Sequence, residues 1–388
     1  MNENKNHAAI TRPLIGNFAR NEWSIVGGPC TVIKFLAGQI IKALSPKYKC
    51  AYADSSHSDD ITQLPGRLAD NAYLEYTDQI NYSQLNYNEP LTVFKQRELF
   101  NNADLVLVNG NHQQAKAQVV IVDLNKRASL QKRVQELTNV QLFLLADNTD
   151  DLFDFIKEYI TNWQEIPVMR LNDDVPAIVS FFESKLKDTK PVLNGLVLAG
   201  GKSERMGVDK GAINWHGKEQ RYFMADMLTS YCNEVYISCR DEAQLSQIDT
   251  AYQTLTDTFT GLGPFGAILT AFRHQPDSAW LVVACDLPLV DKQILDSLTN
   301  NRNTAYMATA FKSNYNDFPE PLITIYETKS YLTLLQFLRQ GYSCPRKALI
   351  NNEINLLPTP ANDALANVNT PEDKERIRQY FTIKNNAS

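Results

Sequence analysis

The chain has 388 residues, 44% hydrophobic and 21% charged, a composition typical of soluble globular proteins at a length that predicts two domains. The formal net charge of −6 argues against a nucleic acid or an anionic membrane surface as the main partner, so phosphate binding must be local. No apolar run reaches the roughly 18 to 20 residues that span a bilayer, and six scattered cysteines without a C-x-x-C pair favour reduced thiols in a cytoplasmic location.

Apolar spacing at the start of the chain predicts a strand over 23–27 and a helix over 31–44. This order is the outline of a phosphate loop. A Walker pattern counted from Gly28 puts Lys34 at the lysine position, but Ile33 replaces the second glycine and Phe35 replaces the Mg²⁺-binding Ser/Thr. Gly28 and Lys34 are therefore candidate residues of a degenerate phosphate loop.

β-rich runs at 103–109, 118–122 and 141–146 alternate with helical spacing, which predicts a mostly parallel sheet with helices on its faces. Together with the degenerate loop, the run Asp104-Leu-Val-Leu-Val-Asn-Gly110 resembles the MobB family of P-loop proteins. Asn109 stands where that family tends to have glutamate. Two roles stay open for this half: a structural or docking domain that has lost nucleotide hydrolysis, and an active nucleotide-binding domain.

Helical periodicity over 175–186, followed by the polar stretch KDTKPV, predicts an exposed boundary between the halves. We expect a degenerate P-loop domain over 1–165, a helical linker over 166–192 and a second domain over 193–388.

A glycine-rich stretch opens the second domain. After a buried strand expected over 195–199, Gly200 and Gly201 remove two β-carbons, so that backbone N–H groups can approach an anion. Arg205 and Lys210 add cationic donors, which are the groups that a triphosphate requires. The stretch therefore predicts a phosphate-handling loop.

A family resemblance is carried by the run Leu198-Ala199-Gly200-Gly201-x-Ser203-x-Arg205-Met206-Gly207-x-Asp209-Lys210. It resembles the signature loop of the molybdenum cofactor guanylyltransferases, the MobA family. The resemblance implies that the nucleotide is bound by residues 198–201 and by Lys210. It also implies that Arg205 and Lys210 act in catalysis. The resemblance further implies guanine rather than cytosine, because the cytidylyl relatives usually show a different order of small residues at Ala199-Gly200-Gly201.

The alternation continues with helices expected over 221–231, 265–272 and 291–298, and strands over 234–238, 254–257 and 280–284. It predicts a Rossmann-like, doubly wound α/β sheet, like that of the first domain, with ligands beyond the carboxyl ends of the strands.

Two aspartates fall at such strand ends. Asp286, in WLVVACDLP, is held on a proline-fixed turn and suits a hard cation such as Mg²⁺; a turn cap is the alternative. The segment also resembles the C-D-x-P element of the family. Asp257 precedes the glycines that open the next helix. The resemblance implies that Asp257 binds the nucleotide through its base or ribose, and that Ser238 lines the base pocket.

Near the end of the chain, Asn367-Val-Asn369-Thr-Pro-Glu-Asp matches an N-x-N-T-P element that the family places toward the pterin substrate. Thr370-Pro371-x-Asp373 is also a good helix start. Arg346 and the stretch 319–322 are candidates for the pterin phosphate or a lid, with a surface loop as the alternative.

The resemblance over 193–382 implies transfer of GMP from GTP to molybdopterin, which yields the guanine dinucleotide cofactor and pyrophosphate. The nucleophile is already an anion and needs no general base, so Lys210 and Arg205 would neutralise charge while Asp286 positions Mg²⁺. GTP and molybdopterin are the expected partners, and the resemblance allows a molybdoenzyme or its chaperone as recipient. Two alternatives remain: a cytidylyltransferase or sugar-phosphate nucleotidylyltransferase of the same fold, and a non-catalytic protein that binds and delivers the cofactor.

Overall fold

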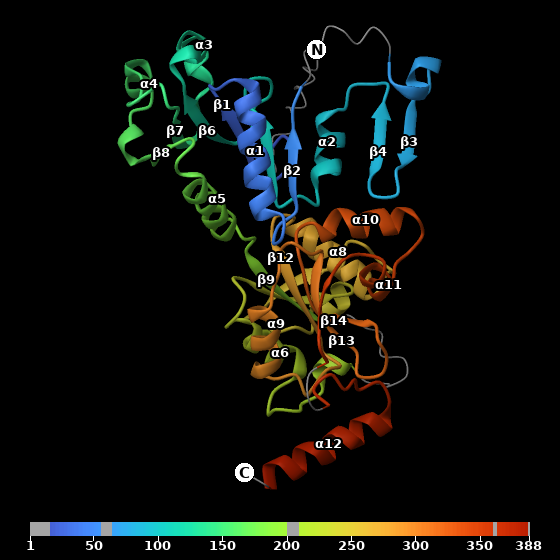
Figure 1. Cartoon of the computed structure of the whole chain (residues 1–388). Coiled ribbons are helices and arrows are strands. Elements are labelled where there is room, and N and C mark those ends of the chain that lie inside the picture. Colours follow the sequence, from blue (N-terminus) through green and yellow to red (C-terminus); the bar gives the residue numbers. More distant parts are fainter. Residues whose placement is uncertain (1–15, 56–63, 200–208, 360–362, 387–388) are drawn as a thin grey trace, which may run out of the picture. The chain divides into compact units, whose positions relative to one another are not determined.

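The computed structural model describes residues 16–55, 64–199, 209–359 and 363–386. The chain divides into two compact units, Met1–Thr189 and Lys190–Ser388, and each is built around its own sheet (Figure 1). None of the helices in these described ranges combines the length and the apolar character that crossing a bilayer requires.

Within its described residues, the first unit contains six parallel strands in the order β2-β5-β1-β6-β7-β8 and a separate antiparallel hairpin, β3–β4. Its elements are β1 (Glu22–Val26), α1 (Cys30–Leu44), β2 (Cys50–Ala53), β3 (Leu74–Asp78), β4 (Ser83–Tyr87), α2 (Val93–Phe100), β5 (Leu105–Asn109), β6 (Ala117–Val122), α3 (Arg127–Lys132), β7 (Val140–Leu145), α4 (Asp154–Tyr159), β8 (Val168–Arg170) and α5 (Val175–Asp188). The expected parallel sheet is confirmed, whereas the hairpin was not anticipated.

Helices cover both faces of this sheet because side chains alternate along each strand. In β5, Leu105 and Leu107 pack under α1 and α5, while Val106 and Val108 face the opposite cluster.

Helix α5 lies in the range expected as a linker, but it is part of the core of the first unit. Its buried residues Ile178, Phe182 and Leu186 recur every fourth position and so form one apolar face. The ring of Phe182 meets Trp23 of β1 edge-on at 5.1 Å. A helix held in this way does not act as a free connector.

In the part of the second unit that the structure describes, seven strands form a sheet in the order β11-β10-β9-β12-β14-β13-β15. Strands β9 to β12 run parallel, and β14 is antiparallel to both of its neighbours. The elements are β9 (Leu193–Leu198), α6 (Gln220–Leu228), β10 (Val235–Cys239), α7 (Glu242–Leu245), β11 (Gln253–Thr256), α8 (Pro264–His274), β12 (Ala279–Ala284), α9 (Lys292–Asn300), β13 (Ala308–Lys312), β14 (Pro319–Tyr326), α10 (Ser330–Arg339), α11 (Pro345–Ile350), β15 (Asn355–Leu357) and α12 (Pro371–Asn386).

Two apolar clusters sandwich this sheet. Leu281 and Val283 of β12 pack with α6 and α9 on one face, while Trp280 and Val282 pack with α8, α10 and α11 on the other (Figure 1). Both faces are thus buried, as a doubly wound sheet requires.

The stretch 319–322, considered above as a lid or surface loop, is instead the start of strand β14. Arg346 lies in the short helix α11. The two prolines of the stretch are tolerated because the pairing with β13 is irregular there, with a register shift between Ala310 and Lys312.

Candidate functional site

Lys210 and Asp286 come together beyond the carboxyl ends of β9 and β12, which are neighbouring parallel strands. The Nζ atom of Lys210 lies 3.6 Å from Oδ2 of Asp286 and donates a hydrogen bond of 2.6 Å to Oδ1 of Asn369. Three segments far apart in the sequence therefore meet at one cationic group. This is the edge at which α/β sheets of this kind bind ligands.

Lys210 is held in place by its neighbour. Lys210 opens a short 3₁₀ helix (Lys210–Ala212) that Asp209 caps, with Oδ1 accepting a hydrogen bond from the backbone N–H of Gly211 at 2.9 Å. The other oxygen of Asp209 accepts a hydrogen bond of 3.0 Å from Nη1 of Arg221, a buried residue of α6. The cap fixes the backbone from which the Lys210 side chain projects.

Asp286 follows an apolar strand that is buried along its whole length. Burial raises the pKa of the Asp286 carboxyl above its usual value, and the adjacent ammonium of Lys210 opposes that rise. The side chain keeps 21% of its surface exposed, so a ligand can reach it.

These residues fit a magnesium ion that is shared with a substrate. Outside the undescribed segments, no three His, Cys, Asp or Glu side chains are grouped so as to hold a metal on their own. Mg²⁺ is usually held by one or two carboxylates together with substrate phosphates and water. Asp286 can supply one such carboxylate.

Asp257 and Ser238 also lie at neighbouring strand ends, after β11 and within β10. Ser238 Oγ donates to Asp257 Oδ1 across 3.4 Å. Burial raises the pKa of Asp257 to about 6, and the serine hydroxyl opposes this shift. The following turn contains Gly261 and Gly263 at φ +77° and +56°, a conformation that favours glycine, and leads into α8.

The start of the signature loop is anchored at Ala199, whose carbonyl oxygen accepts a 2.7 Å hydrogen bond from Nε2 of the buried Gln244. Leu198 ends β9 directly before it. Gly200, Gly201 and Arg205 lie outside the described residues.

The residues expected near the pterin separate into two groups. Asn369 contacts Lys210, and the backbone N–H of Val368, beside Asn367, donates to the carbonyl oxygen of Asp286 at 2.9 Å. Arg346 instead donates to Oε2 of Glu320 at 2.9 Å. The guanidinium of Arg346 is thus already paired with a carboxylate.

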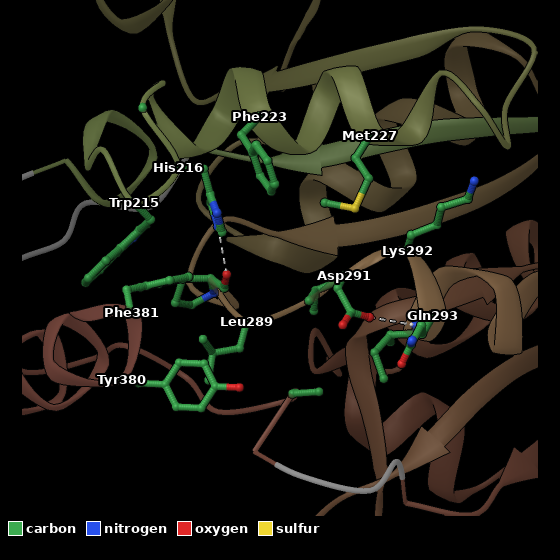
Figure 2. Close-up of a pocket in the computed structure, with 15 residues that line it drawn as sticks. Trp215, His216, Phe223, Met227, Leu289, Asp291, Lys292, Gln293, Tyr380 and Phe381 are labelled. Carbon is green, nitrogen blue, oxygen red and sulfur yellow. Dashed lines mark hydrogen bonds between the residues drawn. The ribbon is translucent and has the colours of Figure 1, made fainter. Parts of the chain in front are cut away.

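A groove of about 800 Å³ lies next to this edge. Figure 2 shows Phe223 and Met227 of α6 on one side and Tyr380 and Phe381 of α12 on the other. The Nε2 atom of His216, which precedes α6, is 3.0 Å from the carbonyl oxygen of Pro288, and the ring of His216 meets Phe381 of α12 edge-on at 4.9 Å (Figure 2). The packing of α12 therefore shapes this groove.

Two residues of the degenerate loop expected around Gly28 contact side chains from other segments of the first unit. Lys34 pairs with Asp54 at 3.3 Å, and Asn111 Nδ2 donates to the carbonyl oxygen of Gly28 at 2.8 Å. A Cβ placed on Gly28 would lie 2.9 Å from Cδ1 of Ile121, so the loop sits tightly on the sheet. A cavity of about 310 Å³ lies beside Gly28, with Lys126 and other residues on its lining.

Sequence reasoning missed the supporting contacts of Asp209, Arg221 and Gln244, and also that of Asp373, whose carboxylate accepts a hydrogen bond from the backbone N–H of Asn369 at 3.1 Å. Asp209 stands inside the signature run and Asp373 inside the helix start, so their positions were visible although their contacts were not.

The fold and the site define the second unit as a nucleotidyltransferase domain. A family model described as MobA-like NTP transferase domain matches residues 195–353. A molybdenum cofactor guanylyltransferase of Pseudomonas fluorescens is 31% identical over 185 residues, which are 46% of this chain and 89% of that protein. The chain belongs to the molybdenum cofactor guanylyltransferase family.

A molybdenum cofactor biosynthesis bifunctional protein of a Synechocystis species is 33% identical over 185 residues, or 48% of this chain. The match spans about half of that relative, 53% of its length. The structural neighbours of the N-terminal half include a MobB protein homolog from Bacillus stearothermophilus, with a TM-score of 0.31 and 18% identity over 43% of this chain and 99% of that one.

Proposed function

We propose that the second unit transfers GMP from GTP to molybdopterin, forming the guanine dinucleotide cofactor and releasing pyrophosphate. Membership of the guanylyltransferase family supports GTP and molybdopterin as the two substrates. The observation that carries the proposal is the convergence of Lys210, Asp286 and Asn369 at the sheet edge where the signature strand β9 ends.

The chemistry assigned to the residues is electrostatic. The terminal phosphate of molybdopterin would attack the α-phosphorus of GTP and needs no general base, because it is already an anion. Lys210 would neutralise charge that develops on the triphosphate, with Arg205 of the signature loop as its partner. Asp286 would hold Mg²⁺, which supplies Lewis-acid neutralisation of the phosphate oxygens.

Asp257 and Ser238 would form the base side of the site. Their side chains touch each other at adjacent strand ends, and an ionised Asp257 could accept hydrogen bonds from N–H groups of guanine or from a ribose hydroxyl. Asn367 and Asn369 would face the pterin substrate, with Leu198 to Gly201 along the nucleotide. The scattered free cysteines fit a reaction in the cytoplasm.

The test is pyrophosphate release by the full chain with GTP, molybdopterin and Mg²⁺, with product identified by mass. Release with GTP and not with CTP supports the proposal. Release with CTP instead would assign a cytidylyltransferase of the same fold. Binding of molybdopterin without any pyrophosphate release would assign a delivery protein and overturn the proposed reaction.

Melting with each nucleoside triphosphate gives an independent comparison. A ligand that binds the folded chain at a hundred times its dissociation constant stabilises it by about 2.7 kcal/mol, so GTP should raise the melting temperature more than CTP, UTP or ATP.

For the first unit we retain two roles. The ion pair of Lys34 with Asp54 and the hydrogen bond from Asn111 to Gly28 support a structural or docking domain. GTP binding by the isolated range 16–189, measured by calorimetry, would instead support a nucleotide-binding domain.

A further inference from the structure

Helix α12 begins with a reciprocal cap directly beside Lys210. The backbone N–H of Asp373 donates to Thr370 Oγ1 at 3.2 Å, and Oδ2 of Asp373 accepts from the backbone N–H of Thr370 at 3.1 Å. This is the geometry of a capping box with aspartate as its acidic member. The same Oδ2 also accepts from the backbone N–H of Asn369 at 3.1 Å.

The third hydrogen bond connects the cap to the site. Asn369 is the residue whose Oδ1 holds the ammonium of Lys210 at 2.6 Å, whereas Asp286 lies a full 1 Å farther away, at 3.6 Å. The remaining oxygen of Asp373 pairs with Arg376 at 3.3 Å, so the carboxylate is held from both sides. Asp373 therefore fixes the backbone that presents the amide of Asn369.

A neutral amide is a suitable partner for this lysine. If Lys210 were drawn fully onto Asp286, its charge would be compensated and the carboxylate would be less available to a cation. The contact to Asn369 orders the ammonium without adding charge, so that Lys210 keeps a looser pairing with Asp286, at 3.6 Å. The strength of electrostatic stabilisation depends on such prior order, because a displacement of about 1 Å can cost on the order of a hundredfold in rate.

We propose that Asp373 is a positioning residue: through the backbone of Asn369 it sets where the Lys210 ammonium stands relative to Asp286. The proposal rests on the proposed function, since it takes Lys210 to act on the bound nucleotide.

The primary test is GTP affinity of the full chain by calorimetry, with Mg²⁺ and again with EDTA. Asp373→Ala should weaken GTP binding about tenfold, since it loosens one charge-assisted contact. The GTP affinity of Asp373→Asn, which keeps one acceptor oxygen, should lie between the affinities of the wild type and of Asp373→Ala. Melting curves check that each variant remains folded.

Two controls separate positioning from helix stability. Glu372→Ala removes an exposed carboxylate from the same first turn and should change GTP affinity by less than about twofold. Thr370→Ala removes one half of the cap but leaves the hydrogen bond from Asn369 to Asp373 in place. Equal losses in Thr370→Ala and Asp373→Ala would mean that fraying of α12 is the cause, and would overturn the proposal.

A double-mutant cycle tests the route through Asn369. Asn369→Ala should weaken GTP binding, and adding Asp373→Ala to it should cause no further loss beyond about twofold. Additive losses would show that Asp373 acts by another route. In turnover, Asp373→Ala should lower kcat more than it raises KM for molybdopterin, because it contacts neither substrate.

The two proposals fail in different ways. A wild-type chain that binds no GTP, with or without Mg²⁺, overturns the proposed function. A wild-type chain that binds GTP as tightly as its Asp373→Ala variant overturns only the positioning role.

Discussion

Replacing Lys210 with alanine is expected to lower kcat/KM for GTP about a hundredfold. The ammonium lies 3.6 Å from a carboxylate oxygen of Asp286, and this distance sets the scale for its interaction with an anion. Two unit charges separated by 3.6 Å interact by about 1 kcal/mol in water and by about 5 kcal/mol at an effective dielectric constant of 20. A hundredfold loss corresponds to about 2.7 kcal/mol, which falls between these two limits. An intermediate value is expected because the Lys210 side chain is 22% exposed and so is neither fully solvated nor fully buried.

The assay is steady-state pyrophosphate release with GTP, molybdopterin and Mg²⁺. Lys218→Ala is the matched control, because Lys218 belongs to the same connection but bonds to Asp226 and to Tyr252 Oη at a site 45% exposed. Exposed ion pairs contribute about 0 to 1 kcal/mol, so this control should keep nearly full kcat/KM.

The reasoning is refuted if Lys210→Ala retains more than about half of the wild-type kcat/KM while it remains folded. A loss confined to KM would also contradict it, because a charge that acts on the transition state must lower kcat.

Three further outcomes follow from the structure. Asp257 has a pKa raised from 3.8 to about 6, so the unfolding free energy of the wild type should fall relative to Asp257→Asn as pH rises through this window, measured by melting at pH 4 and pH 7.5. Glu327→Gln breaks a buried pair with Arg302 at 2.6 Å and should cost about 3 to 5 kcal/mol in urea unfolding, against about 1 kcal/mol or less for the exposed Asp317→Asn. Limited proteolysis by a protease of low sequence specificity should cut near the exposed Lys190, between the end of α5 and the start of β9, and leave two folded fragments; a single resistant fragment would contradict two independent domains.

The alternating strands and helices of both units could be predicted because apolar residues recur with a different spacing in a strand than in a helix. The run at 280–284 is apolar at every position and became the central strand β12, and the helix expected over 31–44 is α1. Asp286 could be singled out because it directly follows an apolar run that reads as a strand. Lys210 could be singled out because it lies in the glycine-rich stretch that follows another such run.

What sequence spacing could not supply was contact across the chain. Lys210 and Asn369 are 159 residues apart, and no local pattern shows that they touch. The helix α5 was expected from its periodicity, but the sequence does not say which core its apolar face joins. The stretch 319–322 was considered for the pterin phosphate or a lid, or as a surface loop, whereas it begins strand β14, where its prolines lie beside the register shift in β13.

The pairing of Lys210 with Asp286 has a consequence for how the site passes between its free and its occupied state. A partly buried carboxylate and an ammonium each carry a desolvation cost that the other offsets when no substrate is present. Under the proposed function, a metal-bound triphosphate would bring a cation for Asp286 and an anion for Lys210, so both side chains would exchange one counter-charge for another. Neither needs to be left uncompensated during binding. The amide of Asn369 holds Lys210 without adding charge of its own, so this contact would not oppose the exchange.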